Sequence, residues 1–546
     1  MPTCPRREVL RIDSNAADAH RLLGIVLAQR GLNADAAHHL DRALELDPAS
    51  SESHAARGNL FLLGEQYGKA AACYDRALTI DPANAPAHFN LGLAAQAQGD
   101  RVRALQALSR AFEIAPDIPD LLKNLTLCLM ELERHADART MLEQILARAP
   151  HDYEANRCMG LVLQKLHAPR DALACYERVI EQGENDPELL NNFAIVLQDL
   201  GRLDEAIAYY DRAIALKPDF PLAIWHRSLA YLMQHDFSRG WPDYELRTLN
   251  VELPRRARTF PRWQGEPLHG RTLLVYAEQG LGDEIMFSSC IPDLLAAGGR
   301  VIIECSKKLE PVFRRSFASA VVYAFDERRS IPPELEQAGI DFEIPIGSLP
   351  LQFRRSHAEF PPHHGYLKAD PARVEQWRER LAALGPGLKV GIAWQGGTRR
   401  SRRVVRSLAL DQLRPVLATR DVHFVDLQYA DCAGEIAAFR ASSGIAIASH
   451  DEIRSDYEGT VALVAALDLV ISVCTAVIHL GGALGRPVWV MAPFSPEWRY
   501  GITGDAMPWY PAVRVYRQPA YGQWEPVIEE VARNLQQLRD KSCSAD

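Results

Sequence analysis

The chain has 546 residues, long enough for three domains of ordinary size, and its 47% hydrophobic and 24% charged residues are normal for a globular protein. The formal net charge of −9 argues against a nucleic-acid-binding protein, because such proteins usually carry a basic domain. No apolar run approaches the length of about eighteen residues that would indicate a membrane span.

The N-terminal segment shows no secretion signal, since residues 1–7 lack an apolar core. Residues 9–13 resemble the last turns of a helical repeat whose first helix is missing. Either the assigned start lies too far downstream or the array begins with an exposed half-repeat, and we favour the first. The 10 cysteines form no Cys-x-x-Cys pair and no metal-ligand cluster. We therefore expect no metal site and a reducing cytoplasm.

The first half of the chain repeats itself every thirty-four residues. The landmarks are a small residue, an alanine twelve positions later and a proline that closes the unit: Gly24, Gly58, Gly92, Gly160 and Ala194; Ala36, Ala70, Ala104, Ala138, Ala172 and Ala206; Pro48, Pro82, Pro116, Pro150 and Pro218. Apolar residues recur at helical spacing on either side of a short polar turn. Each unit is predicted to hold two antiparallel helices that cross closely at the small residue.

These landmarks resemble those of tetratricopeptide repeats and predict an all-α superhelix of six and a half to seven repeats over residues 1–250. The seventh unit diverges, with Gly240 and Trp241 at the place of the alanine. The concave groove of such an array binds extended peptides, so a protein or peptide partner is expected there.

One repeat position carries Asn90, Asn124 and Asn192. An asparagine amide both donates and accepts hydrogen bonds, so these residues are candidates for a ladder that holds the backbone of an acceptor peptide. The alternative is that asparagine is simply ordinary at this position of the repeat.

After an Arg- and Pro-rich linker at residues 251–270, short apolar runs alternate with helical stretches. Strands are predicted at 273–277, 301–305, 320–325 and 342–346, and then at 389–394, 423–427, 445–448, 469–473 and 488–491. This alternation is typical of parallel sheets covered by helices. It predicts two facing Rossmann-like α/β domains at residues 271–386 and 387–546, with a final helix near 525–539 that packs on either one.

The first chemical candidate is Asp283 in the Gly280-Leu-Gly282-Asp segment that follows the first predicted strand and opens a helix. The glycines permit a tight turn and a close backbone approach, at the sheet edge where open α/β sheets bind ligands. The carboxylate can cap the helix, or it can take a proton from an attacking hydroxyl group.

Two further segments lie at the corresponding edge of the second sheet. Thr475 begins a helix whose free N–H groups suit a diphosphate, and His479 lies one turn further on the same face, although a lone helical histidine is usually structural. Residues 399–406 contain five arginines, which suit phosphate contacts unless they form a solvated surface. We expect Arg406 to make such a contact.

Together these segments resemble the family-9-like heptosyltransferase group of glycosyltransferases, in the form that bacteria fuse to tetratricopeptide repeats. The resemblance runs from about residue 261 to 538 and rests on the segments 280–283, 391–394, 406–407, 427–428, 466–472, 475–479, 496–499 and 508–511. It implies the two-domain GT-B fold, with Asp283 as the base of a metal-independent, inverting sugar transfer that uses no cofactor beyond a nucleotide-sugar co-substrate. The donor-binding residues it implies are Gly280, Gly282, Trp394, Arg406, Gln428, Cys474, Thr475, Ala476 and His479.

One position departs from the family pattern. Cys474 stands where the family usually has an aspartate that helps to hold the donor sugar, and a thiol is a poor acceptor for sugar hydroxyl groups. Gly396-Gly397 also replaces the common Asn-Pro. Cys474 therefore bears on the donor identity and on activity itself.

The leading hypothesis is a cytoplasmic protein glycosyltransferase, similar in outline to the O-linked N-acetylglucosamine transferases, in which the repeats hold a protein acceptor such as flagellin. One alternative is a non-catalytic scaffold with a degenerate GT-B half. Another is a transferase to a lipid-linked or polysaccharide acceptor, for which the repeats have no obvious use.

Overall fold

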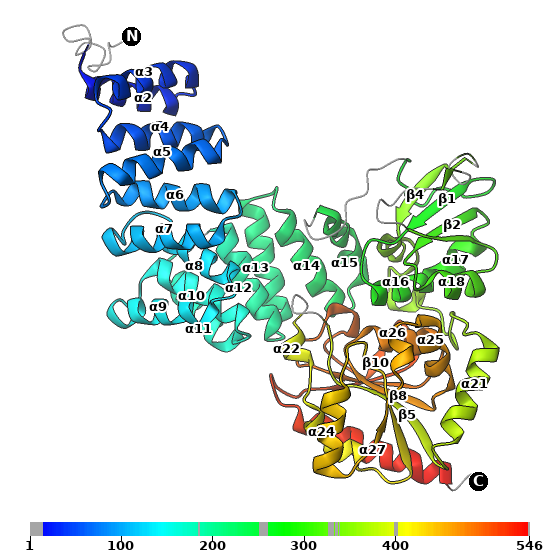
Figure 1. Cartoon of the computed structure of the whole chain (residues 1–546). Helices are drawn as coiled ribbons and strands as arrows, with labels where there is room; N and C mark the ends of the chain where they lie inside the picture. Colours follow the sequence, from blue (N-terminus) through cyan, green and yellow to red (C-terminus); the bar gives the residue numbers. More distant parts are fainter. Residues whose placement is uncertain are drawn as a thin grey trace. The chain divides into compact units, whose positions relative to one another are not determined.

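The structure, a computed structural model, describes residues 15–183, 186–249, 260–325, 332–333, 337, 339–397 and 402–543 (Figure 1). The chain divides into two compact units, residues 1–184 and 185–546. The predicted half-repeat at residues 9–13, linker residues 251–259, and Arg399 and Arg400 lie outside the described residues.

The first unit is a stack of helix pairs, as predicted. Its helices are α2 (Ala17–Gln29), α3 (Asn33–Leu46), α4 (Ser51–Leu63), α5 (Tyr67–Ile80), α6 (Ala85–Ala97), α7 (Arg101–Ile114), α8 (Leu121–Glu131), α9 (His135–Arg148), α10 (Tyr153–Lys165) and α11 (Pro169–Ile180). In each repeat that ends with a proline, the proline stands two residues after the last residue of the second helix, as Pro82 does after Ile80. The two-helix repeat is confirmed.

The repeated glycines lie where the two helices of a pair approach each other. A methyl group on any of the four would lie within 2.7 Å of a side-chain carbon of the leucine or tyrosine sixteen residues later; the glycines are Gly24, Gly58, Gly92 and Gly160. Their small size is therefore required by helix contact and not by backbone conformation.

The second unit begins with the last two helix pairs of the array. These are α12 (Pro187–Asp199), α13 (Leu203–Leu216), α14 (Pro221–Met233) and α15 (Phe237–Tyr244), followed by the 3₁₀ turn η1 (Glu245–Leu249). In the divergent seventh pair, a methyl group on Gly240 would lie 2.6 Å from Leu232 Cδ2, so the close approach persists with the glycine on the second helix. The predicted repeat domain of residues 1–250 thus contributes to both compact units.

The first sheet is parallel, with strand order β3-β2-β1-β4. Its strands are β1 (Thr272–Tyr276), β2 (Arg300–Cys305), β3 (Val321–Ala324) and β4 (Phe342–Pro345). The intervening helices and turns are α16 (Leu281–Phe287), η2 (Ser288–Cys290), α17 (Ile291–Ala296), α18 (Glu310–Ser316), η3 (Ile346–Ser348), α20 (Pro350–Phe353) and η4 (His357–Glu359). All four predicted strands form, within one or two residues of the predicted bounds.

The second sheet has the order β10-β11-β9-β8-β5-β6-β7. Its strands are β5 (Leu388–Ala393), β6 (Val422–Asp426), β7 (Ile447–Ala448), β8 (Leu469–Val473), β9 (Val488–Ala492), β10 (Ala506–Met507) and β11 (Tyr510–Arg517). The sequence did not predict β10 and β11, which pair antiparallel with each other at one edge, while β11 joins β9 in parallel. A short strand and a strand that holds Pro511 near its start give no clear apolar run.

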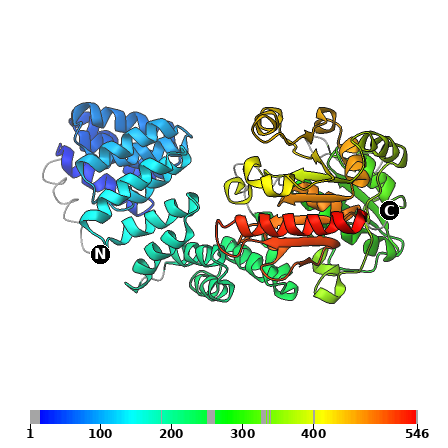
Figure 2. The same cartoon turned by 90° about the horizontal axis from the view of Figure 1, so that it is seen from below.

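Helices cover the second sheet. They are α21 (Pro371–Ala382), α22 (Arg403–Arg406), α23 (Arg414–Leu417), α24 (Ala433–Ser443), α25 (Tyr457–Ala466), α26 (Ala476–Ala483) and α27 (Glu525–Cys543), with the 3₁₀ turns η6 (Leu410–Leu413), η7 (Asp451–Arg454) and η8 (Trp498–Tyr500). The C-terminal helix α27 lies along this sheet, which settles the choice left open by the sequence (Figure 2). Helix α21 packs on α25, with Arg373 2.6 Å from Asp456, although it precedes the predicted boundary at residue 387.

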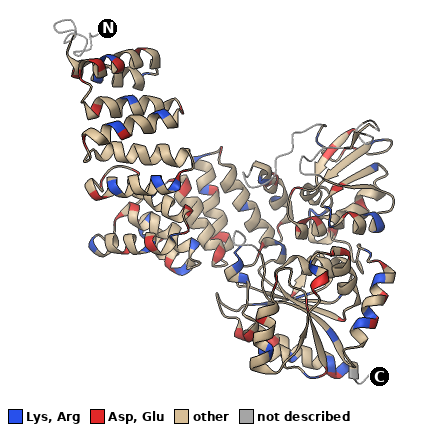
Figure 3. Ribbon diagram, in the orientation of Figure 1, with Lys and Arg blue, Asp and Glu red and all other residues tan. Residues whose placement is uncertain are grey.

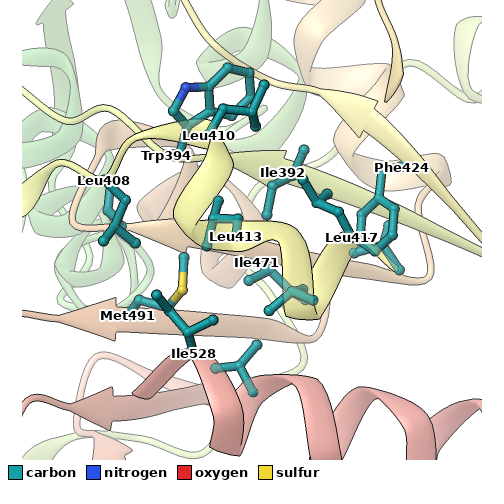
Figure 4. Packing of buried hydrophobic residues seen from close by; sticks show 14 of the residues in the cluster. Ile392, Trp394, Leu408, Leu410, Leu413, Leu417, Phe424, Ile471, Met491 and Ile528 are labelled. Carbon is teal, nitrogen blue, oxygen red and sulfur yellow. The ribbon is translucent and has the colours of Figure 1, made fainter. Parts of the chain in front are cut away.

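The core of this second α/β domain is built from apolar side chains on the strands and on the helices that cover them. Ile392, Phe424 and Ile471 come from the sheet, Leu413 comes from η6, and Ile528 comes from α27 (Figure 4). Burial of this continuous apolar layer fixes the sheet and so fixes the loops at its edge.

Charged residues of both signs are interspersed along the helices of each unit, in the view of Figure 3. None of the described helices is long and apolar enough to cross a membrane.

Candidate functional site

In both sheets the strand order reverses beside one strand, which is β1 in the first sheet and β5 in the second. In the first sheet, β2 and β3 lie on one side of β1 and β4 lies on the other. In the second, β6 and β7 lie on one side of β5 and β8 lies on the other. Open α/β sheets bind ligands at the carboxyl ends of the strands beside such a reversal. The loops after β1, β5, β6 and β8 carry the predicted donor-site residues.

Asp283 lies in the first turn of α16 and does not cap that helix through its side chain. Its Oδ1 instead accepts a hydrogen bond from Arg499 Nη2 at 2.5 Å. Arg499 belongs to η8 of the second α/β domain, so this ion pair joins the two domains. Desolvation lowers the pKa of the half-buried Arg499 guanidinium, but the charges of Asp283 and Glu497 outweigh it and raise the pKa, so Arg499 stays charged.

The two glycines of this loop differ in their roles. A methyl group on Gly282 would lie 3.1 Å from His479 Cδ2 and 3.5 Å from Ala476 Cα, because α16 and α26 meet there. Gly280 has an ordinary extended backbone, and the nearest atom to a methyl group on it would be Asp283 Oδ2 at 3.6 Å. Close approach of the helices therefore requires a small residue at position 282 and not at 280.

A cavity of about 310 Å³ brings most of the predicted residues together. Its walls include Gly282, Asp283, Arg406, Cys474, Thr475, Ala476 and His479, together with Leu281, Gly397, Tyr429, Arg499 and Tyr500. Asp283 and the first turn of α26 thus line one cavity.

A second cavity of about 250 Å³ shares four lining residues with the first: Leu281, Tyr429, Thr475 and Ala476. Gln428, Arg454 and Tyr457 line it from the second domain, and Lys308 lines it from the first. The two cavities therefore adjoin along the first turn of α26 and provide room for a ligand with two parts.

The first turn of α26 suits an anion. Thr475 is the N-cap residue, and its side chain makes no capping hydrogen bond; its Oγ1 lies 3.1 Å from Ser472 Oγ. The N–H groups of a first helical turn lack acceptors within the helix, and together with the helix dipole they favour a phosphate.

The arginines of the loop after β5 separate in the structure. Arg406 lines the first cavity and is paired with Glu497. Arg402 lies 3.0 Å from Asp199 of α12, and Arg403 donates to Gln395. Among the arginines of this loop that the structure describes, Arg406 is the one that reaches the cavity.

Cys474 and His479 contribute neutral groups to the cavity wall. Burial and the nearby Glu497 raise the pKa of the Cys474 thiol, so the sulfur stays protonated at neutral pH. Burial and the charge of Arg499 lower the pKa of His479, whose Nδ1 lies 3.1 Å from the hydroxyl oxygen of Tyr510. Neither group supplies charge to a bound ligand.

Three predicted donor residues lie elsewhere. Gly280 lines neither of the two cavities. Trp394 lines neither cavity, because its side chain is completely buried in the core and its indole N–H donates to Glu435 at 3.1 Å. Gln428 lines the second cavity and not the first. Burial of a large aromatic side chain under the β5 loop is a packing role that the sequence motif does not distinguish from ligand contact.

The candidate ladder residues are half-buried and make contacts within the repeats. The Asn90 amide donates to Asn59 at 2.9 Å, and the Asn124 amide donates to the carbonyl oxygen of Asp120 at 2.8 Å. Asn192 accepts from its neighbour Asn191 at 3.3 Å. Asn192 belongs to the second unit, so the structure does not place it relative to the other two.

The sequence analysis gave no role to Arg499, Tyr500 or Tyr429, which line the first cavity. Arg499 and Tyr500 lie in or beside the Pro-Glu-Trp-Arg segment at 496–499, and Tyr429 directly follows Leu427-Gln428. Their positions in or next to these segments were the only feature of the sequence that could have indicated a place in the site. Over the described ranges, no group of three His, Cys, Asp or Glu residues could hold a metal ion.

Comparisons with known proteins bear on the repeats. Models described as "Tetratricopeptide repeat" match residues 7–51 and 85–217, and one described as "TPR repeat" matches residues 58–99. The N-terminal region therefore consists of tetratricopeptide repeats. Among solved structures, pilF of Pseudomonas aeruginosa is similar at 25% identity over 41% of this chain and 99% of that one, with a TM-score of 0.34. YrrB, "a TPR protein with an unusual peptide-binding site", is similar at 23% identity over 35% and 98%, with a TM-score of 0.29.

Protein FlbA of Caulobacter vibrioides is 35% identical over 310 residues, which cover 54% of this chain and 52% of FlbA. The chain thus spans about half the length of this curated relative.

Proposed function

We propose that the chain is a cytoplasmic, inverting and metal-independent glycosyltransferase of the GT-B type, which moves a sugar from a nucleotide donor to a protein acceptor held by the repeats. One observation carries the proposal: a single cavity holds a carboxylate, Asp283, together with two guanidinium groups, Arg406 and Arg499, and the first turn of α26.

The donor is proposed to lie across the two adjoining cavities. Its diphosphate would face the first turn of α26, where the N–H groups and Arg406 can stabilise negative charge. Its nucleoside would occupy the second cavity, beside Gln428 and Tyr457. The sugar would then project into the first cavity, toward Asp283.

Asp283 is proposed to take the proton of an acceptor serine or threonine hydroxyl group as its oxygen attacks the anomeric carbon. The bond from that carbon to the diphosphate oxygen breaks, and the leaving diphosphate keeps the electron pair. General-base catalysis of this kind typically contributes about 10²–10⁴ in rate. Because Arg499 is paired with Asp283, we expect the guanidinium to shift toward the diphosphate when the donor binds, which frees the carboxylate and stabilises the leaving group.

The test is the mass of candidate acceptor proteins after incubation with the purified protein and a panel of sugar nucleotides. The native protein should add one sugar mass, and Asp283→Asn should lower the rate by about 10² or more. Asp293→Asn is the matched control, because Asp293 also pairs with a buried arginine, Arg354, at 2.7 Å but lines neither cavity. Unchanged acceptor mass throughout would count against transfer.

The scaffold alternative is favoured by one observation, the buried and neutral thiol of Cys474 in the proposed sugar site. If the α/β half has lost donor binding, no UDP-, GDP-, ADP- or CMP-linked ligand will stabilise the protein in a thermal-shift measurement. Stabilisation by one of these nucleotide classes supports the transferase and identifies its donor.

The third function, transfer to a lipid-linked or polysaccharide acceptor, is distinguished by truncation. A deletion to residue 250 would remove α12–α15, which belong to the compact unit of the α/β domains. Deletion of residues 1–184 is the appropriate change. Transfer that survives this deletion with a non-protein acceptor, while no protein is modified by the full chain, favours the third function.

A further inference from the structure

The last turns of the repeat array lie against the loop that carries Asp283. The Gln279 amide donates to the hydroxyl oxygen of Tyr244 at 3.1 Å. Arg247 donates to Glu278 Oε1 through both Nε at 3.1 Å and Nη2 at 2.9 Å. Tyr244, Arg247 and Glu278 are all buried, so this contact is sealed from solvent.

Arg247 also connects this loop to the loop after β4. Its Nη2 donates to Ser348 Oγ at 2.8 Å. A methyl group on Gly347 would lie 2.5 Å from Glu278 Oε1 and 3.0 Å from Arg247 Nη2, so a small residue there leaves room for the ion pair. The two loops that flank the reversal point of the first sheet are therefore joined through one guanidinium group from the repeats.

Tyr244 occupies a repeat position at which tyrosine normally bonds within its own helix pair. Tyr176 donates to Gln164 at 3.1 Å, and Tyr210 donates to Gln198 at 3.1 Å. Tyr244 stands thirty-four residues after Tyr210, but its glutamine partner, Gln279, lies outside the array. The array thus uses a standard internal hydrogen bond to hold the loop of the α/β domain.

We propose that Tyr244 and Arg247 are positioning residues for the Asp283 carboxylate, acting through Gln279 and Glu278; this inference rests on the proposed function of Asp283 as the base. The segment from Glu278 to Asp283 runs directly from β1 into the first turn of α16. Displacement of its start moves the carboxylate within the cavity. A misplacement of about 1 Å can cost about 10²-fold in rate.

The test compares Tyr244→Phe with Tyr210→Phe in the full chain. Each variant removes one tyrosine–glutamine hydrogen bond at the same repeat position, but the Tyr244 bond alone reaches the Asp283 loop. Tyr244→Phe should lower kcat about tenfold and leave the donor Kd unchanged, whereas Tyr210→Phe should change neither. Arg247→Lys should also lower kcat, because lysine lacks the guanidinium fork that holds Glu278. Lysine keeps the positive charge, so this variant is less disruptive than one that removes the charge.

A second measurement does not depend on transfer. Amide hydrogen exchange at residues 277–284 should be faster in Tyr244→Phe and Arg247→Lys than in the native protein and in Tyr210→Phe. Unchanged exchange at residues 277–284 overturns the inference. Faster exchange spread over residues 185–546 also overturns it, and so does a loss of donor affinity as large as the loss of kcat. Failure of the proposed function is a separate result, seen as full turnover in Asp283→Asn or as no transfer by the native protein while the local exchange effect persists.

Discussion

The helix pairs of the first unit and the last pair, α14–α15, follow one thirty-four-residue template but use it differently. In the first unit, Tyr74 donates to Asn59 of its own pair. In the last pair, the Trp241 indole N–H donates to the carbonyl oxygen of Arg354 at 2.7 Å, and its ring lies 5.5 Å from that of Trp498. Departures from the repeat pattern therefore mark the place where the array joins the α/β domains.

The same contrast holds for ion pairs. Arg57 of the second repeat lies 2.6 Å from Asp41, and the Asp41 side chain is 51% exposed. Arg247, after the last pair, lies 2.9 Å from Glu278, and the two side chains are 2% and 6% exposed. An exposed pair adds little to stability, whereas loss of one partner from a buried pair leaves an uncompensated charge.

One of the two largest effects is expected for Trp241→Ala, which removes the ring contacts with Trp498 and Trp509 of the second α/β domain and the hydrogen bond to the carbonyl oxygen of Arg354 in the first. Loss of a buried tryptophan side chain typically costs about 3–5 kcal/mol, and the free energy of unfolding of the second unit should fall by most of that amount. Denaturant unfolding read by hydrogen exchange in residues 185–546 measures it. Tyr74→Ala is the control and should destabilise the first unit alone. A loss below about 1 kcal/mol in Trp241→Ala would show that the aromatic contacts do not hold the array.

Substitution of the two arginines tests the ion-pair contrast. Arg247→Met leaves the buried Glu278 without its cation and should lower the free energy of unfolding by about 3–5 kcal/mol. Arg57→Met should lower it by about 0–1 kcal/mol. Equal losses in the two variants, measured by urea unfolding, would contradict the contrast between the two regions.

Glycine substitutions test whether the last pair keeps the close helix approach of the others. Gly92→Ala and Gly240→Ala each place a methyl group 2.6 Å from a leucine side chain and should cost about 1–3 kcal/mol. The control is Gly68→Ala in α5, where the nearest atom would lie 3.4 Å away, and a gain of about 0.5–1 kcal/mol is expected. A cost at 92 without one at 240 would separate the last pair from the array.

The last effect depends on pH and is absent at neutral pH, where His226 is uncharged in the folded and unfolded chain alike. Burial lowers the pKa of His226 in α14 from 6.5 to about 4. Below pH 6.5 the unfolded chain therefore binds a proton that the folded chain does not, and stability falls toward pH 4 by up to about 1.4 kcal/mol per pH unit. In His226→Gln this slope between pH 6.5 and 4 should be shallower by that amount. An unchanged slope in urea unfolding would exclude His226 as its source.

Much of the fold could be predicted from the sequence. Local apolar patterns predicted the repeat helices and nine strands, because those elements are defined by runs of neighbouring residues. The pair β10–β11 was missed, since a two-residue strand and a strand containing Pro511 lack such a run. The choice of sheet for α27 was open, because an amphipathic helix does not specify which apolar surface it covers.

The candidate site was predictable where it follows strand ends. Asp283, Arg406 and Thr475 line one cavity because parallel sheets bring their loops to the carboxyl edge. Trp394 was expected there for the same reason, but its aromatic side chain packs into the core. Arg499 was not expected, because its contact with Asp283 joins positions 216 residues apart along the chain.

The amino-acid sequence by itself determined the helix pairs, the parallel strands and the loops that end them, because each depends on residues close together in the chain. The tertiary structure alone decided which repeat pairs belong with the α/β domains and which partners the buried and half-buried charges take. Those outcomes depend on burial and on contacts between distant segments, as in Arg247 with Glu278 and Arg499 with Asp283. No local pattern encodes such pairings, because their energy arises only once both groups are removed from water.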